Sequence, residues 1–363
     1  MNYYDLSDHL LPTSESYGFG QPDYWVWCGS AIRGDDKLYH MFSARWPKSL
    51  PFFSGYIAAS EIVHAVSPTP EGPYEFRDIV LGDRGEEYWD GRMTHNPSIV
   101  KVGGLYYLFY IGGTYKGARP NHDELCGERS CPKINECYSS IRIGVAVSDS
   151  LYGPWQRFDE PVFSPSRDGW DSRIVTNPAP YVCPDGSILL YYRSNTPGKL
   201  CIGVARAANV YGEAHICETH ICEPLKFEPL RFERISDRPL FDSHPEINVE
   251  DPFVWHNGDC YQMLAKDIAG TSGEVGSGLQ LISRDGLDWE YAPQPHAYTR
   301  TLEFTDGQKR LAYHLERPNL TIEDGIPRFM CAAYGKDGGE VQPHCGNFDR
   351  MSESMTIVIP LSK

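Results

Sequence analysis

A nine-residue pattern occurs twice in this chain, 81 residues apart. The first copy reads Trp89-Asp90-Gly91-Arg92-Met93-Thr94-His95-Asn96-Pro97, and the second reads Trp170-Asp171-Ser172-Arg173-Ile174-Val175-Thr176-Asn177-Pro178. Trp, Asp, Arg, Asn and Pro recur at identical spacing, and an apolar run that ends in aromatics follows each copy, at residues 105–110 and 188–192. A repeat at this period indicates one supersecondary unit that is used several times around an axis or along a stack.

A second repeat supplies the outer strands of this unit. A short alternating strand, a Gly-containing turn and a strand-starting aromatic recur near residues 60–74, 141–155, 201–212 and 278–289. Inner strands are expected at residues 28–32, 96–100, 177–182, 251–255 and 317–322. Five four-stranded sheets around an axis form a β-propeller, so the sequence predicts an all-β, five-bladed β-propeller as a single domain over residues 1–363. Residues 355–361 are expected to close the ring, and no long helical period is found.

Two insertions interrupt the repeat, at about residues 116–138 and 215–223. The first contains His122, Cys126, Cys131 and Cys137, and the second contains His215, Cys217, His220 and Cys222. Thiolates and imidazoles are the usual ligands of zinc, which either loop could bind. The spacings match no standard zinc motif, however, and the alternative is a surface loop with reduced thiols.

The composition excludes some classes of protein. A net charge of −16 argues against a nucleic-acid-binding surface, which would need a basic face. The first residues contain neither a basic segment nor an apolar run, so we expect no signal peptide, no membrane association and a cytoplasmic location. Cys28, Cys183, Cys260 and Cys331 lie in or beside apolar runs, which favours buried free thiols over disulfides.

Polar residues next to the start of each inner strand would face the common axis of such a ring. Pro is tolerated there because the first residue of a strand need not donate to the ladder. The residues that we expect to bind substrate at this place are Trp27, Asp90, Arg92, His95, Asn96, Arg173, Asn177, Asp251, His314, Glu316 and Arg317. The further carboxylates near the inner strands are Asp23, Asp171, Glu246 and Glu250.

With these features the chain resembles the five-bladed propeller glycosidases, the arabinanase, xylosidase and invertase group of glycoside hydrolase families 43, 32, 68 and 117. The most specific part is the Gly-Val-Ala-x-Ser…Gly-Pro-Trp unit at residues 144–155, and the blade repeat extends the resemblance over nearly the whole chain. In that group a base or nucleophile Asp lies in blade one, a pKa-tuning Asp in blade three and a general-acid Glu in blade four. The resemblance implies that Glu250 is the acid and that Asp171 and Asp23 are the nearest matches for the other two. Blades one and three depart from the pattern, because Asp23 lies upstream of its strand and Asn177 takes the place before Pro.

The chemistry independently asks for carboxylates in pairs. Glycosidic cleavage needs a protonated acid on the leaving oxygen and an ionised carboxylate opposite it, and neighbouring carboxylates raise the pKa of one member. Glu250 beside Asp251 and near Glu246 offers such a cluster. Because adjacent residues of a strand point in opposite directions, we expect only one of Glu250 and Asp251 to face the axis, and the other to cap backbone amides.

Several candidates have a structural alternative. Asp90 and Asp171 could each pair with the Arg two residues on and hold the blade together. If Arg92, Arg173 and Arg317 reach the axis, they would favour a sugar with a carboxylate, such as a uronic acid, because Arg binds carboxylates through two hydrogen bonds. His95 and His314 could be acid/base groups, ligands of a structural or axial calcium ion, or simply bonded to the backbone. Aromatics could stack on sugars or pack in the core, and these are Trp25, Trp27, Trp46 and Trp89.

The leading hypothesis is an exo-acting glycoside hydrolase with an oligosaccharide substrate. A glycoside phosphorylase of the mannoside type is the second, and it would need a cluster of Arg, Lys and His for phosphate. The third is a non-catalytic carbohydrate-binding propeller, since a fold alone does not determine function.

Overall fold

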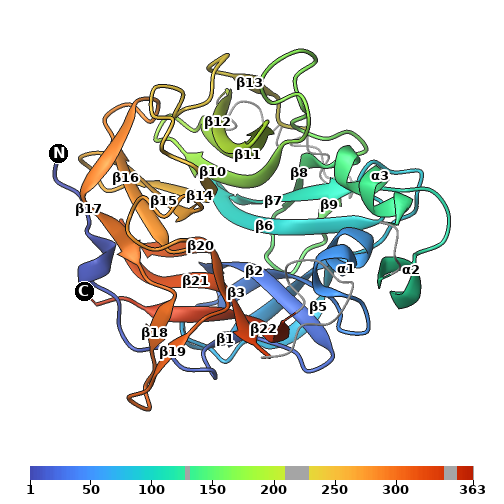
Figure 1. Ribbon diagram of the computed structural model, residues 1–363, viewed down its shortest axis with the longest axis horizontal. Coiled ribbons are helices and arrows are strands. Elements are labelled where there is room, and N and C mark those ends of the chain that lie inside the picture. The colour runs from blue at the N-terminus through green and yellow to red at the C-terminus, as the bar shows by residue number, and fades with distance from the viewer. Residues whose placement is uncertain (127–130, 209–228, 339–349, 363) are drawn as a thin grey trace, which may run out of the picture.

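The computed structural model describes residues 1–126, 131–208, 229–338 and 350–362. Five four-stranded antiparallel sheets surround a central axis, which makes the molecule a five-bladed β-propeller (Figure 1). The predicted all-β propeller is therefore confirmed. We number the blades I to V in the chain order of their innermost strands.

Each blade runs outward from the axis in the order of its strands. Blade I contains β2 (Tyr24–Arg33), β3 (Tyr39–Pro47), β4 (Glu61–Ser67) and β5 (Glu75–Leu81), and blade II contains β6 (Met93–Val102), β7 (Leu105–Gly113), β8 (Arg142–Ser148) and β9 (Gln156–Arg157). Blade III contains β10 (Thr176–Val182), β11 (Ile188–Thr196), β12 (Lys199–Ala207) and β13 (Phe232–Arg234), and blade IV contains β14 (Val249–His256), β15 (Tyr261–Asp267), β16 (Gly278–Ser283) and β17 (Trp289–Tyr298). All five predicted inner strands lie within β2, β6, β10, β14 and β20, the last of which starts blade V.

Blade V joins the two ends of the chain. It contains β20 (His314–Glu323), β21 (Ile326–Asp337), β22 (Met351–Pro360) and, outermost, the N-terminal β1 (Gly18–Phe19). Gly18 pairs with Ile357, and a Cβ on Gly18 would lie 2.0 Å from the carbonyl oxygen of Thr356, so only glycine fits there. The strand predicted at residues 355–361 does belong to the closing blade, but the ring is completed by β1, which the sequence pattern did not reveal.

The elements outside the blades are short. The 3₁₀-helix η1 (Leu6–Asp8) precedes blade V's outer strand, and β18 (Thr301–Glu303) and β19 (Lys309–Leu311) form a separate two-stranded ribbon. Helix α1 (Phe52–Ala59) joins β3 to β4, and α2 (His122–Cys126) and α3 (Pro132–Ser140) lie in the predicted insertion of blade II. The other predicted insertion, at about residues 215–223, lies outside the described residues. In the described ranges no helix is long and apolar enough to cross a membrane.

The core lies between neighbouring blades. Phe109 of β7 and Tyr192 of β11 are fully buried and belong to one apolar cluster between blades II and III. The aromatic runs that follow each nine-residue repeat therefore become the second strands of their blades, where both faces are covered.

A β-bulge at the same position interrupts all five inner strands. One residue in each bulge has a positive φ, between 48° and 58°, namely Cys28, Asn96, Asn177, Asp251 and Arg317. Bulges re-aim side chains, and non-glycine residues with positive φ store backbone strain that is typical of functional sites. The five bulges surround the axis at one end of the propeller, where the candidate site lies.

Candidate functional site

A pocket of about 190 Å³ opens at the end of the axis where the inner strands begin. Three positions recur in each blade around the axis there, and all of them except Cys28, Ala44 and Ala333 line the pocket. The residues before the bulges are Trp27, His95, Thr176, Glu250 and Glu316, and the bulged residues are those with positive φ. The residues opposite on the second strands are Ala44, Ile111, Arg193, Lys266 and Ala333. The five blades thus share the same backbone arrangement at these positions, but each blade carries different side chains there.

Hydrogen bonds between bulged residues form the floor of the pocket. Asn96 donates its Nδ2 to Oδ1 of Asn177 at 3.0 Å, and Asn177 donates its Nδ2 to Oδ1 of Asp251. The second carboxylate oxygen of Asp251 accepts from the backbone N–H of Arg317 at 3.2 Å. All four residues are buried, so blades II to V are connected through one polar chain across the axis.

Blades III to V form a charged wall. The Lys266 ammonium donates to Oε1 of Glu250 at 3.1 Å and also to Oε1 of Glu316. Nδ1 of His314 lies 3.0 Å from the same oxygen of Glu316, and Nε of Arg193 lies 3.4 Å from Oε2 of Glu250. One ammonium therefore holds carboxylates from two neighbouring blades side by side.

The surroundings of these carboxyl groups give them different pKa values. Burial, reinforced by the neighbouring Glu250 carboxylate, raises the pKa of Asp251 to about 7. Burial acts in the same direction on Glu316, but the Lys266 ammonium and His314 outweigh it and lower the pKa of Glu316 to about 2. The cluster therefore combines a group that keeps its proton close to neutral pH with one that stays ionised, which is the arrangement used in acid/base catalysis.

The opposite wall is apolar and comes mainly from blade I and α1. Its aromatic side chains are Trp27, Trp46, Phe52, Phe53 and Tyr56. The rings of Trp27 and Phe52 meet edge to face at 4.9 Å. Helix α3 packs beside α1 (Figure 1) and adds Tyr138 to the same pocket. A sugar ring has an apolar face and polar edges, and such a two-sided pocket matches both.

His95 belongs to the apolar side of the pocket. Tyr56 stacks on its ring at 4.7 Å, its Nδ1 lies 2.9 Å from Oγ of Ser60 and its Nε2 lies 3.7 Å from Sγ of Cys28. Burial, reinforced by the charge of Arg317, lowers the pKa of His95 to about 3. The imidazole is therefore neutral at physiological pH and does not supply a proton there.

The pocket brings together eight of the residues predicted for the site. They are Trp27, His95, Asn96, Asn177, Glu250, Asp251, Glu316 and Arg317. His314 reaches the cluster through Glu316. The expectation that only one of Glu250 and Asp251 faces the axis is wrong, because the bulge at Asp251 breaks the alternation of the strand and both residues line the pocket. The expected cap exists, since Asp251 accepts from the backbone N–H of Arg317.

Three other predicted residues lie outside the pocket lining. Asp23 is exposed in the turn before β2, where its carbonyl oxygen accepts from the Lys48 N–H. Arg92 pairs with Asp83 at 3.2 Å on the loop side of blade II, and Arg173 is exposed. The structure therefore brings neither the expected blade-one carboxylate nor these two guanidinium groups to the axis.

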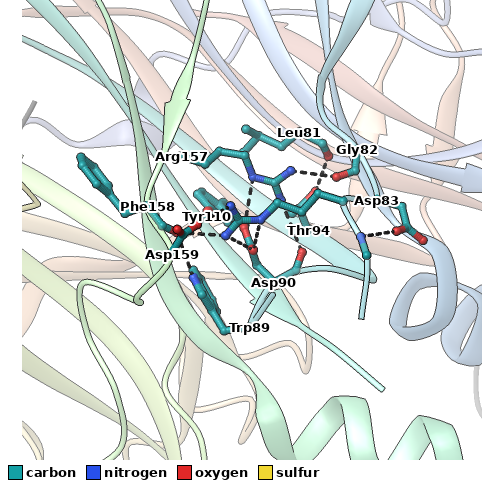
Figure 2. A network of polar contacts seen from close by, with 12 residues as sticks. Leu81, Gly82, Asp83, Trp89, Asp90, Thr94, Tyr110, Arg157, Phe158 and Asp159 are labelled. Atoms are coloured by element: carbon teal, nitrogen blue, oxygen red, sulfur yellow. Dashed lines mark hydrogen bonds and ion pairs between the residues drawn. The ribbon is translucent and has the colours of Figure 1, made fainter. Parts of the chain in front are cut away.

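Asp90 and Asp171 each make contacts within their own blades. The buried Asp90 carboxylate accepts from the Tyr110 hydroxyl at 2.7 Å and pairs with Arg157 at 2.7 Å (Figure 2). It also pairs with Arg84 at 2.6 Å. In blade III the carboxylate of Asp171 accepts from Tyr192 and Arg234, each at 2.8 Å (the equivalent of Tyr110 and Arg157). The expected ion pair within each blade exists, but the partner Arg comes from the outermost strand and not from two residues on.

The Trp of each repeat completes this clamp. Trp89 stacks on Tyr110 at 5.9 Å between ring centroids, and Trp170 stacks on Tyr192 at 6.0 Å. On the third strand a Cβ at Gly144 would lie 2.7 Å from both rings of the first pair. The repeated Trp-Asp dipeptide therefore fastens the inner and outer strands of a blade together.

Sequence reasoning missed Arg193 and Lys266, which carry much of the charge in the pocket. Each lies in a second strand, directly after a buried apolar run that ends with Tyr191 and Tyr192 in β11 and with Leu264 and Ala265 in β15. A single cation directly after such a run was the available signal. It becomes interpretable only once the pairing of these strands places both residues at the pocket.

The cysteines of the described ranges are all free. In the blade II insertion, Sγ of Cys126 lies 3.7 Å from Nε2 of His122, whereas Cys137 is buried and donates to the carbonyl oxygen of Ile57 at 3.2 Å. Among the residues described, no group of three or more His, Cys, Asp or Glu side chains is arranged to hold a metal ion. The Cys/His segment at residues 215–223 lies outside them.

Comparisons with known proteins support the fold. Neither protein-family models nor curated protein sequences give a match. Among solved structures, a family 117 glycoside hydrolase of the marine bacterium Zobellia galactanivorans matches with a TM-score of 0.59 and 14% identity, over 97% of this chain and 89% of that one. An α-L-arabinofuranosidase from Lactobacillus brevis matches with a TM-score of 0.55 and 12% identity, over 98% and 94% of the two chains.

A third similar structure comes from an animal. The family 32 β-fructofuranosidase of Bombyx mori matches with a TM-score of 0.58 and 12% identity, over 99% of this chain and 66% of that one. The chain thus has the fold of the five-bladed propeller glycoside hydrolases, and the expected resemblance extends over nearly its whole length.

Proposed function

We propose that the protein is a glycoside hydrolase that cleaves its substrate in the axial pocket. The observation that carries the proposal is the carboxylate cluster of Glu250, Asp251 and Glu316 facing an aromatic wall at the centre of this fold. Two carboxyl groups of unlike acidity are the machinery that glycoside hydrolysis uses. The similar structures named above are glycosidases, which is consistent with this function.

In this proposal the Glu250–Asp251 pair acts as the general acid. Burial and the neighbouring Glu250 carboxylate keep a proton on Asp251 up to about pH 7. Glu250 is the more exposed member, with 17% of its side chain accessible, and it presents the pair to the leaving oxygen. Glu316, which Lys266 holds in its ionised form, is the carboxylate that supports the developing positive charge or activates water.

The shape of the pocket favours release of single sugars from a chain end. Its volume of about 190 Å³ suits one sugar residue, with α1 and α3 on one side. The glycone would stack on the aromatic wall and direct its hydroxyls to the charged wall. We therefore propose exo-acting cleavage of an oligosaccharide.

A panel of aryl glycosides and oligosaccharides tests the function. The purified protein is incubated with each compound, with and without inorganic phosphate, and products are separated by chromatography. Release of a single sugar without phosphate supports an exo-acting hydrolase, and release of longer fragments would contradict the exo mode. Silence on every compound would favour a carbohydrate-binding propeller.

One observation favours a second candidate, a glycoside phosphorylase. Arg193, Lys266 and Arg317 place three cations in the pocket, as a phosphate site would require. Each of these cations is within ion-pair distance of a pocket carboxylate, however, which weakens the case for a doubly charged anion. Turnover that depends on phosphate would identify this alternative.

A further inference from the structure

Three cations reach the pocket from three consecutive blades. Arg193 lies in β11 of blade III, Lys266 lies in β15 of blade IV and Arg317 occupies the bulge of β20 in blade V. The positions equivalent to Arg193 and Lys266 in the other blades are Ala44, Ile111 and Ala333. Cations therefore occupy, in blades III and IV, a position that holds an apolar residue in the other blades, and the positive charge lies on one side of the pocket.

Two of these guanidinium groups retain hydrogen-bonding capacity. Nε of Arg193 and NH1 of Arg317 are buried, and neither makes a hydrogen bond to any residue in the described ranges. Their nearest carboxylate oxygens, on Glu250 and Asp251, lie at 3.4 Å and 3.6 Å, which is ion-pair contact without a hydrogen bond. A buried donor without a hydrogen bond is unfavourable, and an oxygen anion is the kind of acceptor that each of these donors lacks.

The charges within the pocket do not cancel below neutral pH. Three cations face three carboxylates, but burial and the charge of Glu250 raise the pKa of Asp251 to about 7. Below that pH the carboxylates carry two negative charges against three positive ones. His95 adds no charge, because burial lowers its pKa to about 3. An excess of one positive charge lies at the centre of a chain whose net charge is −16.

We propose that the pocket recognises a sugar that carries a carboxylate, with Arg193 and Arg317 as the groups that bind it. That the acidic sugar is a substrate rests on the proposed glycosidase function. That the pocket binds an anion does not depend on that function. A uronic acid offers one negative charge and two parallel oxygens, which match the excess charge and the guanidinium geometry. Inorganic phosphate shares this chemistry and is the competing occupant.

Binding of free sugars separates these occupants without requiring turnover. Calorimetry at pH 6 compares glucuronate, galacturonate and mannuronate with glucose, galactose and mannose, and with inorganic phosphate. We expect at least one uronate to bind about 10- to 100-fold more tightly than its neutral counterpart, as for hydrogen bonds to charged groups. Equal binding of every acid and its neutral sugar, or preferential binding of phosphate, would overturn the inference.

Variants of Arg193 tie the preference to the pocket. R193Q should lose most of the preference for the uronate, and R193K, which keeps the charge without the fork of donors, should retain part of it. R173Q is the matched control, because Arg173 is exposed and outside the pocket lining. An unchanged preference in a folded R193Q protein would exclude Arg193 as the binding group. Raising the pH above about 7 should weaken uronate binding as Asp251 ionises.

Measuring cleavage as well as binding distinguishes a failure of this inference from a failure of the proposed function. Cleavage of 4-nitrophenyl uronides in preference to the matching neutral glycosides supports both. Uronate binding with no cleavage of any glycoside would remove the hydrolase function and leave the anion site. Cleavage of neutral glycosides without uronate binding would leave the hydrolase and overturn the anion site.

Discussion

Asp90 and Asp171 share two contacts in neighbouring blades. Each buried carboxylate accepts a hydrogen bond from a tyrosine of its blade's second strand, Tyr110 or Tyr192, at 2.7 and 2.8 Å. Each also pairs with an Arg of the outermost strand, at 2.7 and 2.8 Å. Within a blade, this one side chain connects the approach to the innermost strand with strands two and four.

Removing the Asp90 carboxylate should destabilise the fold without affecting the axial chemistry. In D90A the guanidinium groups of Arg84 and Arg157 lose their shared, buried partner, which should cost about 3–5 kcal/mol of unfolding free energy. Urea denaturation measures the loss. D159A is the control, because Asp159 pairs with the same Arg84 but is 79% exposed, and it should change stability by less than about 1 kcal/mol. Equal effects of the two variants would contradict the clamp.

Gly144 should be intolerant of even one methyl group. A Cβ there would lie 2.7 Å from the Trp89 and Tyr110 rings, so G144A should lower the unfolding free energy by about 1–3 kcal/mol through overpacking. G104A is the matched control, since its Cβ would meet no atom within 4 Å. Thermal unfolding of both variants tests the stacking, and a G144A protein as stable as the wild type would refute the close approach.

Asp251 should make the fold less stable as the pH rises from about 4 to about 7. The carboxyl ionises near pH 4 in the unfolded chain but near pH 7 in the folded one, so in this window the folded state binds the extra proton. The expected contribution to the slope of the unfolding free energy is at most about −1.4 kcal/mol per pH unit. Urea denaturation at several pH values measures it. D251N, which resembles the protonated form, should lack this contribution, and an identical slope in D251N would contradict the raised pKa.

Lys266 should set the acid limb of the pH–activity profile. Its ammonium outweighs burial in holding the pKa of Glu316 at about 2, so K266Q should raise that pKa and shift the acid limb of kcat/KM to higher pH. K101Q provides the control, because Lys101 pairs with the exposed Asp35 far from the pocket and should leave the profile in place. If the profile of K266Q superimposed on that of the wild type, Glu316 would not be the ionised carboxylate of the reaction.

The sequence predicted the blades and the inner strands, because turns, Pro and aromatics recur wherever an inner strand begins and ends. The prediction placed Asp90 and Asp171 near the axis because each belongs to the same nine-residue repeat as a bulged residue. In the structure, however, the chain runs from the outer contacts of the blade at Asp90 to the axis at Asn96. The pairing of residues beside a bulge is a three-dimensional property. For that reason Arg193 and Lys266 became recognisable only in the fold.

Helix α1 escaped prediction for a different reason. Its sequence, Phe52–Ala59, is apolar around most of its circumference and is buried against blade I, so it lacks the one-sided pattern that marks a surface helix. The aromatic wall of the pocket depends on this segment. Three aromatic residues of the pocket wall, Phe52, Phe53 and Tyr56, were therefore hidden in a stretch that reads as core.

The most direct test of the account is the value of kcat/KM on the best aryl glycoside of the panel for the wild type, E250Q and D23N. The account predicts that E250Q loses about 10²- to 10⁴-fold in kcat/KM, as expected for removal of a general acid, while its melting temperature shows that it is folded. D23N, which changes an exposed carboxylate outside the pocket, should keep wild-type activity. Full activity in a folded E250Q protein, or loss of activity in D23N instead, would contradict the assignment of catalysis to the axial carboxylate cluster.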